Sequence, residues 1–319
     1  MSIKNKRIFL TGGAGFIGTK IIERLITDNE IVVYDTFQRD SLANSILKEH
    51  PNITIIKGNV LDKNNVKKAI IGSQIIIHLA AIAGIDTVIK SPTSTMTVNF
   101  VGTSNVLESA KTLPTLERFI DFSTSEVYGS YAFKLGEEQC TTMGAVGAAR
   151  WTYAISKLAA EHLAHGYHEE FHLPVTSIRP FNIYGPGQVG DGAIHNFIIR
   201  AIKNEDIIIH GDGDQIRSWC YVDDMVDAIL LSLENPKAIG EVFNIGNPKG
   251  TITILSLAEK IIDIAKSKSK IVFVPKPYVD VELRIPDIEK SKKVLKFNPK
   301  VDLNIGLMRT IQWYSKRKD

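Results

Sequence analysis

The sequence predicts an α/β protein built on a doubly wound parallel sheet, with a smaller α/β lobe attached. Three observations support this fold class. Strand-like and helix-like segments alternate through the first 180 residues, and a glycine-rich turn joins the first strand to the first helix. The simple alternation then ends over the last 140 residues. Alternation of this kind is typical of parallel sheets with helices on both faces.

The first half of the chain supplies the elements of the sheet. The predicted strands are short runs rich in β-branched residues: Ile8–Leu10, Ile31–Tyr34, Ile53–Ile56, Ile75–His78, Arg118–Phe122 and Val175–Ile178. Helical spacing predicts helices near residues 16–27, 62–71, 96–111 and 150–171. In such sheets ligands bind at the carboxyl ends of the strands, so the residues that follow each strand should carry the function.

A glycine-rich turn follows the first strand, in the segment Thr11-Gly12-Gly13-Ala14-Gly15-Phe16-Ile17-Gly18. Gly13, Gly15 and Gly18 fit G-x-G-x-x-G, and Gly12, Gly15 and Gly18 fit the wider G-x-x-G-x-x-G. Both spacings let the backbone turn sharply and approach a pyrophosphate without an intervening Cβ. The next helix would offer unpaired N–H groups to the phosphates. The turn predicts dinucleotide binding on a Rossmann-type sheet.

An acidic residue, Asp35, ends the second strand at about the ~20-residue distance expected for a group that binds the adenosine ribose hydroxyls. A carboxylate at this place repels a 2′-phosphate, so NAD is favoured over NADP. Arg39 lies close enough in the sequence to leave NADP open.

Further cofactor contacts are expected after the third and fourth strands. Asn59 and Val60 are candidates for the adenine, although the same stretch is equally well explained by a helix cap at Asp62. The small residues after the fourth strand would let a flat ring lie against backbone, whereas His78 is expected to pack in the core. The predicted cofactor site also includes Phe16, Ile17, Leu79, Ala80, Ala81, Asn99 and Pro180.

The fifth strand and the helix after it supply the candidate catalytic residues. Thr124, Ser125 and Glu126 follow the strand, and Tyr153 and Lys157 lie four residues apart, on one face of the predicted helix. A nearby ammonium favours a phenolate, so Tyr153 is predicted to have a lowered pKa and to act as a base near neutral pH. Both residues are also expected to contact the cofactor.

Composition limits the class of protein. The 319 residues carry a net charge of +3, which is too small to suggest a nucleic-acid partner. Cys140 and Cys220 form neither a disulfide framework nor a metal-binding spacing, and this fits a cytoplasmic protein. The sequence contains no run of ~18 apolar residues, so no membrane segment is expected.

The predicted domain boundary lies near residue 180. Residues 1–180 would form the NAD-binding domain, with 211–245 returning to it, and 181–319 would form the substrate lobe. In the second half, helices are expected near 194–203, 223–233, 252–265, 288–295 and 303–314, with strands at 207–210 and 242–245. The cleft between the two parts would hold the substrate.

These motifs together resemble the extended short-chain dehydrogenase/reductases, specifically the NAD-dependent nucleotide-sugar epimerases and dehydratases. The resemblance covers nearly the whole chain. It rests on Thr11–Gly18, His78–Ala81, Ser123–Gly129, Tyr153 with Lys157, Arg179–Pro186, Gly211–Trp219 and Glu282–Ile288.

The resemblance implies that NAD is reduced and reoxidised within one turnover. Tyr153 would take the proton of the sugar 4-hydroxyl, Thr124 would hydrogen-bond that oxygen, and Lys157 would bind the nicotinamide ribose. It further implies a homodimer formed through the helices near 96–111 and 150–171. Asn182, Arg217 and Arg284 match positions that contact the nucleoside diphosphate, which suits the bidentate phosphate binding of arginine.

The residues leave the reaction after C4 oxidation open. Glu126 suits removal of the C5 proton, and this favours dehydration of a neutral UDP- or GDP-linked hexose, with 4-epimerisation as the nearest alternative. Ser125 stands where many dehydratases carry an aspartate, so the general acid is unassigned. A simple 4-keto reductase is a further alternative. A non-catalytic binding module is less favoured, because Thr124, Tyr153 and Lys157 are all present.

Decarboxylation of a glucuronate has separate support. Arg150-Trp151 before Tyr153, and Arg284-Ile285-Pro286-Asp287-Ile288, resemble the glucuronate decarboxylases. Against this, the sugar loop Gly185–Gly192 contains no cation to pair with a substrate carboxylate, and an unpaired buried carboxylate is costly. A neutral sugar is therefore predicted. Cys140 falls in an expected substrate loop, where an inert role is favoured.

Overall fold

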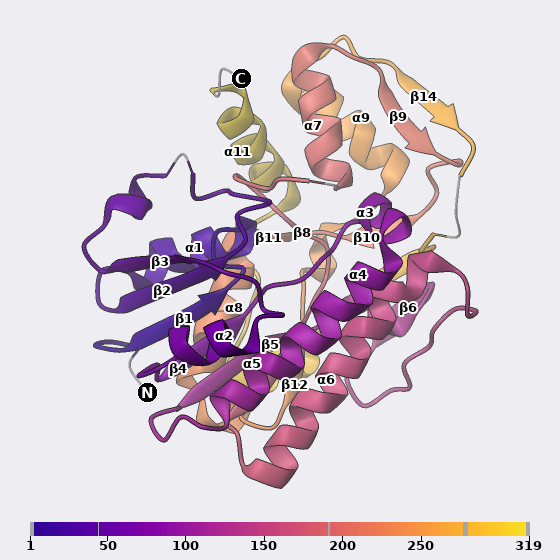
Figure 1. The fold of residues 1–319 in the computed structure, drawn as a ribbon. Coiled ribbons are helices and arrows are strands. Elements are labelled where there is room, and N and C mark those ends of the chain that lie inside the picture. Colours follow the sequence, from indigo (N-terminus) through magenta and orange to yellow (C-terminus); the bar gives the residue numbers. More distant parts are fainter. Residues whose placement is uncertain (1–2, 44, 191, 277–279, 317–319) are drawn as a thin grey trace.

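The computed structural model describes residues 3–316 except 44, 191 and 277–279. Among these residues, seven parallel strands form the main sheet in the order β12-β7-β5-β4-β1-β2-β3 (Figure 1). The strands are β1 (Arg7–Thr11), β2 (Glu30–Asp35), β3 (Ile53–Lys57), β4 (Ile75–His78), β5 (Arg118–Phe122), β7 (Val175–Pro180) and β12 (Val242–Ile245). The predicted doubly wound parallel sheet is confirmed.

Alternate residues of each strand face two different hydrophobic layers. On one face, Ile8 and Leu10 of β1 pack with α1, α8 and α10. On the other face, Phe9 of β1 and Phe119 of β5 pack with α2, α5 and α6. These helices are α1 (Phe16–Leu25), α2 (Lys63–Ala69), α5 (Gly102–Ala110), α6 (Thr152–Phe171), α8 (Val222–Glu234) and α10 (Glu289–Leu295). The period-2 pattern of each strand thus places helices on both faces of the sheet.

The helix expected near 96–111 is assembled from several pieces. α4 (Pro92–Met96) begins at a proline and runs into a π-helical turn (Thr97–Val101), which continues into α5. The sequence analysis missed α3 (Ile85–Lys90), which precedes α4. π-turns inside helices are frequent at functional sites. Here the π-turn carries Asn99, one of the predicted cofactor residues.

The substrate lobe has its own hydrophobic core. α7 (Ala193–Lys203), α9 (Ile254–Ala265) and α11 (Leu303–Ser315) pack around a short parallel pair of strands, β9 (Ile207–His210) and β14 (Ile271–Val274). Figure 1 shows these elements beyond the carboxyl ends of the main sheet. A second short pair joins β8 (Ile183–Tyr184) to β11 (Cys220–Tyr221).

A four-stranded sheet that the sequence analysis did not predict lies at the entrance of the lobe. It pairs β13 (Thr251–Thr253), β10 (Ile216–Ser218), β15 (Leu283–Pro286) and β6 (Tyr131–Leu135) in that order. These strands are three to five residues long and come from four distant parts of the chain, so no local sequence pattern predicts their pairing. β10 belongs to this sheet, and only α8 and β12 of the stretch 211–245 return to the main sheet.

Candidate active site

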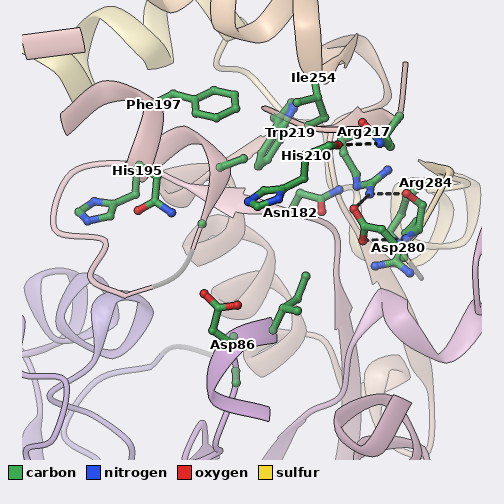
Figure 2. A pocket seen from close by; sticks show the side chains of 18 of the residues that line it. Asp86, Asn182, His195, Phe197, His210, Arg217, Trp219, Ile254, Asp280 and Arg284 are labelled. Atoms are coloured by element: carbon green, nitrogen blue, oxygen red, sulfur yellow. Dashed lines mark hydrogen bonds and ion pairs between the residues drawn. The ribbon is translucent and has the colours of Figure 1, made fainter. Parts of the chain in front are cut away.

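A cleft of about 1110 Å³ separates the carboxyl ends of the main sheet from the lobe. Its lining includes Thr124, Glu126 and Tyr153 from the sheet side and Arg217 and Trp219 from the lobe side. Figure 2 shows Asp86 of α3 facing the lobe residues across the opening. The cleft therefore lies where the fold class places ligand sites.

The glycine turn has the geometry that a dinucleotide needs. Gly12 has φ +66°, and a Cβ placed there would lie 2.7 Å from the backbone nitrogen of Ala80. A Cβ at Gly18 would lie 2.5 Å from the Gly13 carbonyl oxygen. α1 then begins at Phe16 with no side-chain cap, so its first N–H groups are open to a phosphate.

Asp35 lies at the rim of this turn. Its carboxylate accepts hydrogen bonds from the Ala14 N–H at 3.0 Å and the Phe37 N–H at 2.8 Å, which fix its orientation. Burial raises the pKa of Asp35 despite these bonds. The half-buried carboxylate stands beside the phosphate-binding turn, and this arrangement fits an NAD ribose at this place.

His78 belongs to the core, as the sequence analysis expected. Its Nδ1 lies 2.6 Å from Thr11 Oγ1 and its Nε2 lies 2.9 Å from Thr103 Oγ1. Thr103 donates its only hydroxyl proton to the Asn99 carbonyl, so the network assigns the ring proton to Nε2. Burial, with a contribution from Lys157, lowers the pKa of His78 to about 3, which keeps the ring neutral.

The roles of the remaining predicted cofactor residues stay predictions, and the structure shows their surroundings. Asn99 uses its amide to hold Ile82, accepting from its N–H at 2.7 Å and donating to its carbonyl at 3.0 Å. Asn59 lies in a turn, and Asp62 caps α2 by accepting the Asn65 N–H, so the predicted helix cap is confirmed and the adenine contact stays a prediction. Ile17 lies in the first turn of α1, and Val60, Leu79, Ala81 and Pro180 lie at the ends of strands β3, β4 and β7 or within three residues of them.

Tyr153 and Lys157 lie one turn apart on α6, and Tyr153 hydrogen-bonds Thr124 at the end of β5. Thr124 Oγ1 also accepts the Glu126 N–H at 3.2 Å, which opens the short helical turn Ser125–Tyr128 and buries Ser125. The sequence analysis predicted a lowered pKa for Tyr153, and the structure shows that this prediction is wrong. Burial raises the pKa of Tyr153, and the carboxylate of Glu126 raises it further.

Glu126 is held by arginines from two distant elements. Arg150 Nη1, from the short turn Ala149–Trp151 before α6, donates to Glu126 Oε2 at 2.6 Å. Arg284 Nη1, from β15, lies 3.8 Å from Glu126 Oε1. Burial alone raises the pKa of Glu126, but the two guanidinium groups lower it below its usual value. Glu126 is therefore an ionised, charge-paired carboxylate at neutral pH.

A second carboxylate pairs with the lobe arginine. Arg217 Nη2, from β10, lies 3.3 Å from Asp280 Oδ2, and Arg150 Nη2 lies 3.9 Å from Asp280 Oδ1. Figure 2 shows Arg217, Asp280 and Arg284 grouped on one wall of the cleft. We call Arg150, Arg217, Arg284, Glu126 and Asp280 the arginine cluster. Its three cations and two anions leave a net charge of one positive unit.

The sequence analysis missed Arg150 and Asp280 as site residues. Arg150 stands three residues before Tyr153, and the sequence analysis used this position only as part of a resemblance.

Asn182 has φ 42° and donates its amide to the Ser218 carbonyl at 2.9 Å, so it holds β10 in place and also lines the cleft. Cys140 is exposed and is not among the residues that line the cleft. Asp191 of the predicted sugar loop lies outside the described residues.

A family model described as "NAD dependent epimerase/dehydratase family" matches residues 8–246. The chain belongs to this family. The match covers the glycine turn, the Tyr153/Lys157 pair and the return of β12 to the main sheet. Because members are NAD-dependent, the cofactor predicted from Gly12–Gly18 and Asp35 is NAD.

Named relatives and solved structures match nearly the whole chain. A UDP-N-acetyl-alpha-D-glucosaminuronate decarboxylase from Bacillus cytotoxicus is 36% identical, over 97% of this chain and 98% of the relative. UDP-glucuronic acid decarboxylase 1 from Arabidopsis thaliana is 35% identical, over 98% of this chain and 71% of the relative. The crystal structure of UDP-glucuronic acid 4-epimerase from Bacillus cereus, solved with UDP-glucuronic acid and NAD, superposes with TM-score 0.89 at 30% identity, covering 96% of this chain and 98% of that one.

None of the helices among the described residues is long and apolar enough to cross a membrane.

Proposed function

We propose that the protein is an NAD-dependent decarboxylase of a UDP-linked hexuronate, a nucleotide sugar whose C6 is a carboxylate. The observation that carries the proposal is the arginine cluster beside Thr124 and Tyr153. Arg150 supplies the cation that the sugar loop lacks, so the argument for a neutral sugar no longer applies. The named relatives at 35–36% identity act on substrates of this class.

The charge balance of the cleft supports an anionic substrate. A UDP-hexuronate carries a diphosphate and a carboxylate, and the cluster has a net positive charge. Arg284 Nε is buried without a hydrogen-bond partner among the described residues, so it retains a donor for an incoming oxygen. Guanidinium groups suit both phosphate and carboxylate, because they bind planar oxygen pairs bidentately.

The state of Glu126 argues against dehydration, which the sequence favoured. A base that removes the C5 proton works best when its pKa lies near the working pH. Arg150 and Arg284 hold the pKa of Glu126 below its usual value, so this carboxylate is a weak base. We assign it the role of orienting and balancing the two arginines.

Residues of this chain can carry out the proton transfers that follow substrate binding. Bound NAD supplies the acceptor for the C4 hydride and returns it at the end of the cycle. Tyr153 accepts the proton of the sugar 4-hydroxyl. Because burial keeps this phenol protonated at neutral pH, the transfer depends on a nearby positive charge, and Lys157 on the same helix face can provide it.

Oxidation at C4 places a ketone β to the C6 carboxylate. The C5–C6 bond then breaks, its electron pair moves into the C4 carbonyl to form an enolate, and carbon dioxide leaves. Thr124 and Tyr153, which hydrogen-bond each other, can each donate to the enolate oxygen when it takes the place of that mutual bond. A proton takes the place of the carboxylate at C5.

A substrate panel tests the proposal. The purified protein is incubated with NAD and, separately, with UDP-glucuronate, UDP-N-acetylglucosaminuronate, UDP-glucose and GDP-mannose, and products are followed by mass spectrometry. We expect loss of carbon dioxide from one or both uronates and no reaction with the neutral sugars. Loss of water from a neutral sugar would establish dehydration instead. An unchanged mass with an inverted C4 would establish the 4-epimerase, and either result overturns the proposal.

We also infer a cytoplasmic homodimer joined through α5 and α6. Val101, directly before α5, and Phe171, the last residue of α6, are large apolar side chains with 43% and 45% of their surface exposed. Light scattering on the purified protein should give twice the chain mass. A monomer mass at micromolar concentration would contradict the dimer.

A further inference from the structure

A row of polar side chains crosses the main sheet beneath the catalytic helix. Thr11 pairs with His78, His78 pairs with Asp121, and Asp121 pairs with Ser177 across the neighbouring strands β1, β4, β5 and β7. Paired residues in adjacent parallel strands point to the same face of a sheet. That face also carries Phe9, Ile76 and Phe119, which pack against α5 and α6. Asp121 is therefore a carboxylate placed in a hydrophobic layer.

Asp121 is fully buried and only weakly hydrogen-bonded. Its Oδ2 accepts the Ser177 hydroxyl at 3.4 Å, and its Oδ1 has no hydrogen-bond partner among the described residues. Lys157 Nζ, on the helix that covers this face, is buried and has no hydrogen-bond partner among the described residues either. A buried ionised carboxylate and a buried ammonium are each costly unless an opposite charge lies nearby.

The other groups around Asp121 cannot balance its charge. His78, its neighbour on β4, is neutral because both ring nitrogens are engaged by threonines. From β7, Ser177 is neutral and Arg179 is already paired with Glu161, its Nε lying 3.0 Å from Glu161 Oε2.

From α6, Glu161 and Lys157 face the same layer. Glu161 has the same charge as Asp121 and raises its pKa, whereas Lys157 lowers it. Lys157 is the cation that acts on Asp121, and Asp121 is the carboxylate that acts on Lys157.

We propose that Asp121 is a positioning residue that keeps Lys157 in its ammonium form inside the buried site, and so preserves the NAD contact expected of Lys157. The inference rests on the NAD-binding role of Lys157 and is independent of which sugar reaction follows.

The electrostatics of the two groups agree with this role. Burial lowers the pKa of Lys157 from its usual value, and the charge of Asp121 opposes that fall. Burial raises the pKa of Asp121 to about 6, with Lys157 restraining the rise, so the carboxylate is ionised at neutral pH. Without Asp121, nothing among the described residues offsets the burial of the Lys157 ammonium.

The test measures NAD affinity against pH for the NAD-stripped protein and its Asp121→Asn variant, by calorimetry without sugar substrate. In the wild type, affinity should stay level from neutral pH into the alkaline range. In the variant, loss of the counter-charge should lower the pKa of Lys157, so affinity should fall on the alkaline side. If the pKa of Lys157 in the NAD-free protein falls by one unit, binding becomes weaker above the new pKa, and the loss reaches about tenfold above the original pKa.

Ser177→Ala is the matched control, since it removes the hydrogen bond to Oδ2 but leaves the charge of Asp121 in place. Its NAD affinity should follow the wild-type pH profile. Asp121→Leu is a second variant without the carboxylate, in case Asp121→Asn does not fold, and it should show the same alkaline loss. An NAD affinity that falls equally at every pH, or that does not change, would overturn the proposal.

The sugar reaction gives a separate readout. In Asp121→Asn, turnover should fall at alkaline pH and recover toward the wild-type rate as the pH is lowered and Lys157 is protonated again. If the substrate panel identifies a different reaction, the NAD-binding measurement still tests the role of Asp121 independently.

Discussion

The two sides of the cleft offer different physical means of binding a ligand. On the sheet side, the glycine turn offers backbone N–H groups and close approach, and the few charges that matter, such as Asp35, stand at the rim. On the lobe side, the arginine cluster offers buried guanidinium groups whose charge is partly cancelled by Glu126 and Asp280. The sheet side depends on shape, whereas the lobe side depends on a balance of charges.

This difference predicts separable defects. A change in the glycine turn should weaken the binding of NAD and leave the affinity for the nucleotide sugar unaltered. A change in the arginine cluster should leave NAD binding intact, but it should leave a buried charge without its partner, which is the more costly defect. Tyr153 stands where the two sides meet.

The largest effect is expected for Tyr153→Phe. Loss of the phenol removes the proton acceptor, so kcat should fall roughly 1000-fold, while NAD binding should stay within about twofold because the ring remains in place. Steady-state kinetics and calorimetry measure the two quantities. Turnover within tenfold of the wild type would remove Tyr153 from the chemistry.

Arg150→Met should have the next largest effect, specific to the substrate side. The variant leaves Glu126 with one weaker partner, Arg284 at 3.8 Å, and removes the cation expected for the C6 carboxylate. We expect kcat/KM for a UDP-hexuronate to fall roughly 100-fold. Arg24→Met, at an exposed salt bridge on α1, is the matched control and should be close to neutral. Equal activity of Arg150→Met and the wild type would break the proposed role of the cluster.

Gly12→Ala tests the sheet side by itself. The new Cβ would meet the Ala80 nitrogen at 2.7 Å at a backbone angle of φ +66°, so NAD affinity should fall roughly tenfold or more. Gly166→Ala on α6 is the control, because a Cβ there has nothing within 4 Å. The proposed difference between the two sides would be wrong if Gly12→Ala weakened the binding of the nucleotide sugar and left the binding of NAD unchanged.

The smallest expected effect is on the pH dependence of the stability of the folded protein. The pKa of Asp121 in the folded protein, about 6, lies above its ordinary value of 3.8, so the wild type loses stability as pH rises between these values. Asp121→Asn lacks this loss. Its melting temperature relative to the wild type should therefore increase from about pH 4 to about pH 6, by a few degrees at most, and then level off. A difference that shrinks over this range would contradict the burial of an ionised Asp121.

The same contrast explains what could be predicted from the sequence. The glycine turn, Asp35, Thr124, Tyr153 and Lys157 are local signals, since each lies at a strand end or at a fixed helical spacing. The arginine cluster joins residues 126, 150, 217, 280 and 284 from separate parts of the chain, and residues 217 and 284 are brought together by the pairing of β10 with β15. The sequence therefore predicted the fold and the NAD cofactor, but Arg150, which we propose as the cation for a substrate carboxylate, lies outside the loop in which a cation was expected. The raised pKa of Tyr153 was also missed, because burial cannot be read from spacing.

The proposed decarboxylation is tested most directly by following the C6 carbon itself. The protein is given NAD and a UDP-hexuronate that carries carbon-13 at C6, and the released gas and the remaining nucleotide sugar are analysed together. We predict one labelled carbon dioxide for each substrate consumed, with NADH failing to accumulate. Label that stays in the sugar while the substrate is consumed would contradict the account.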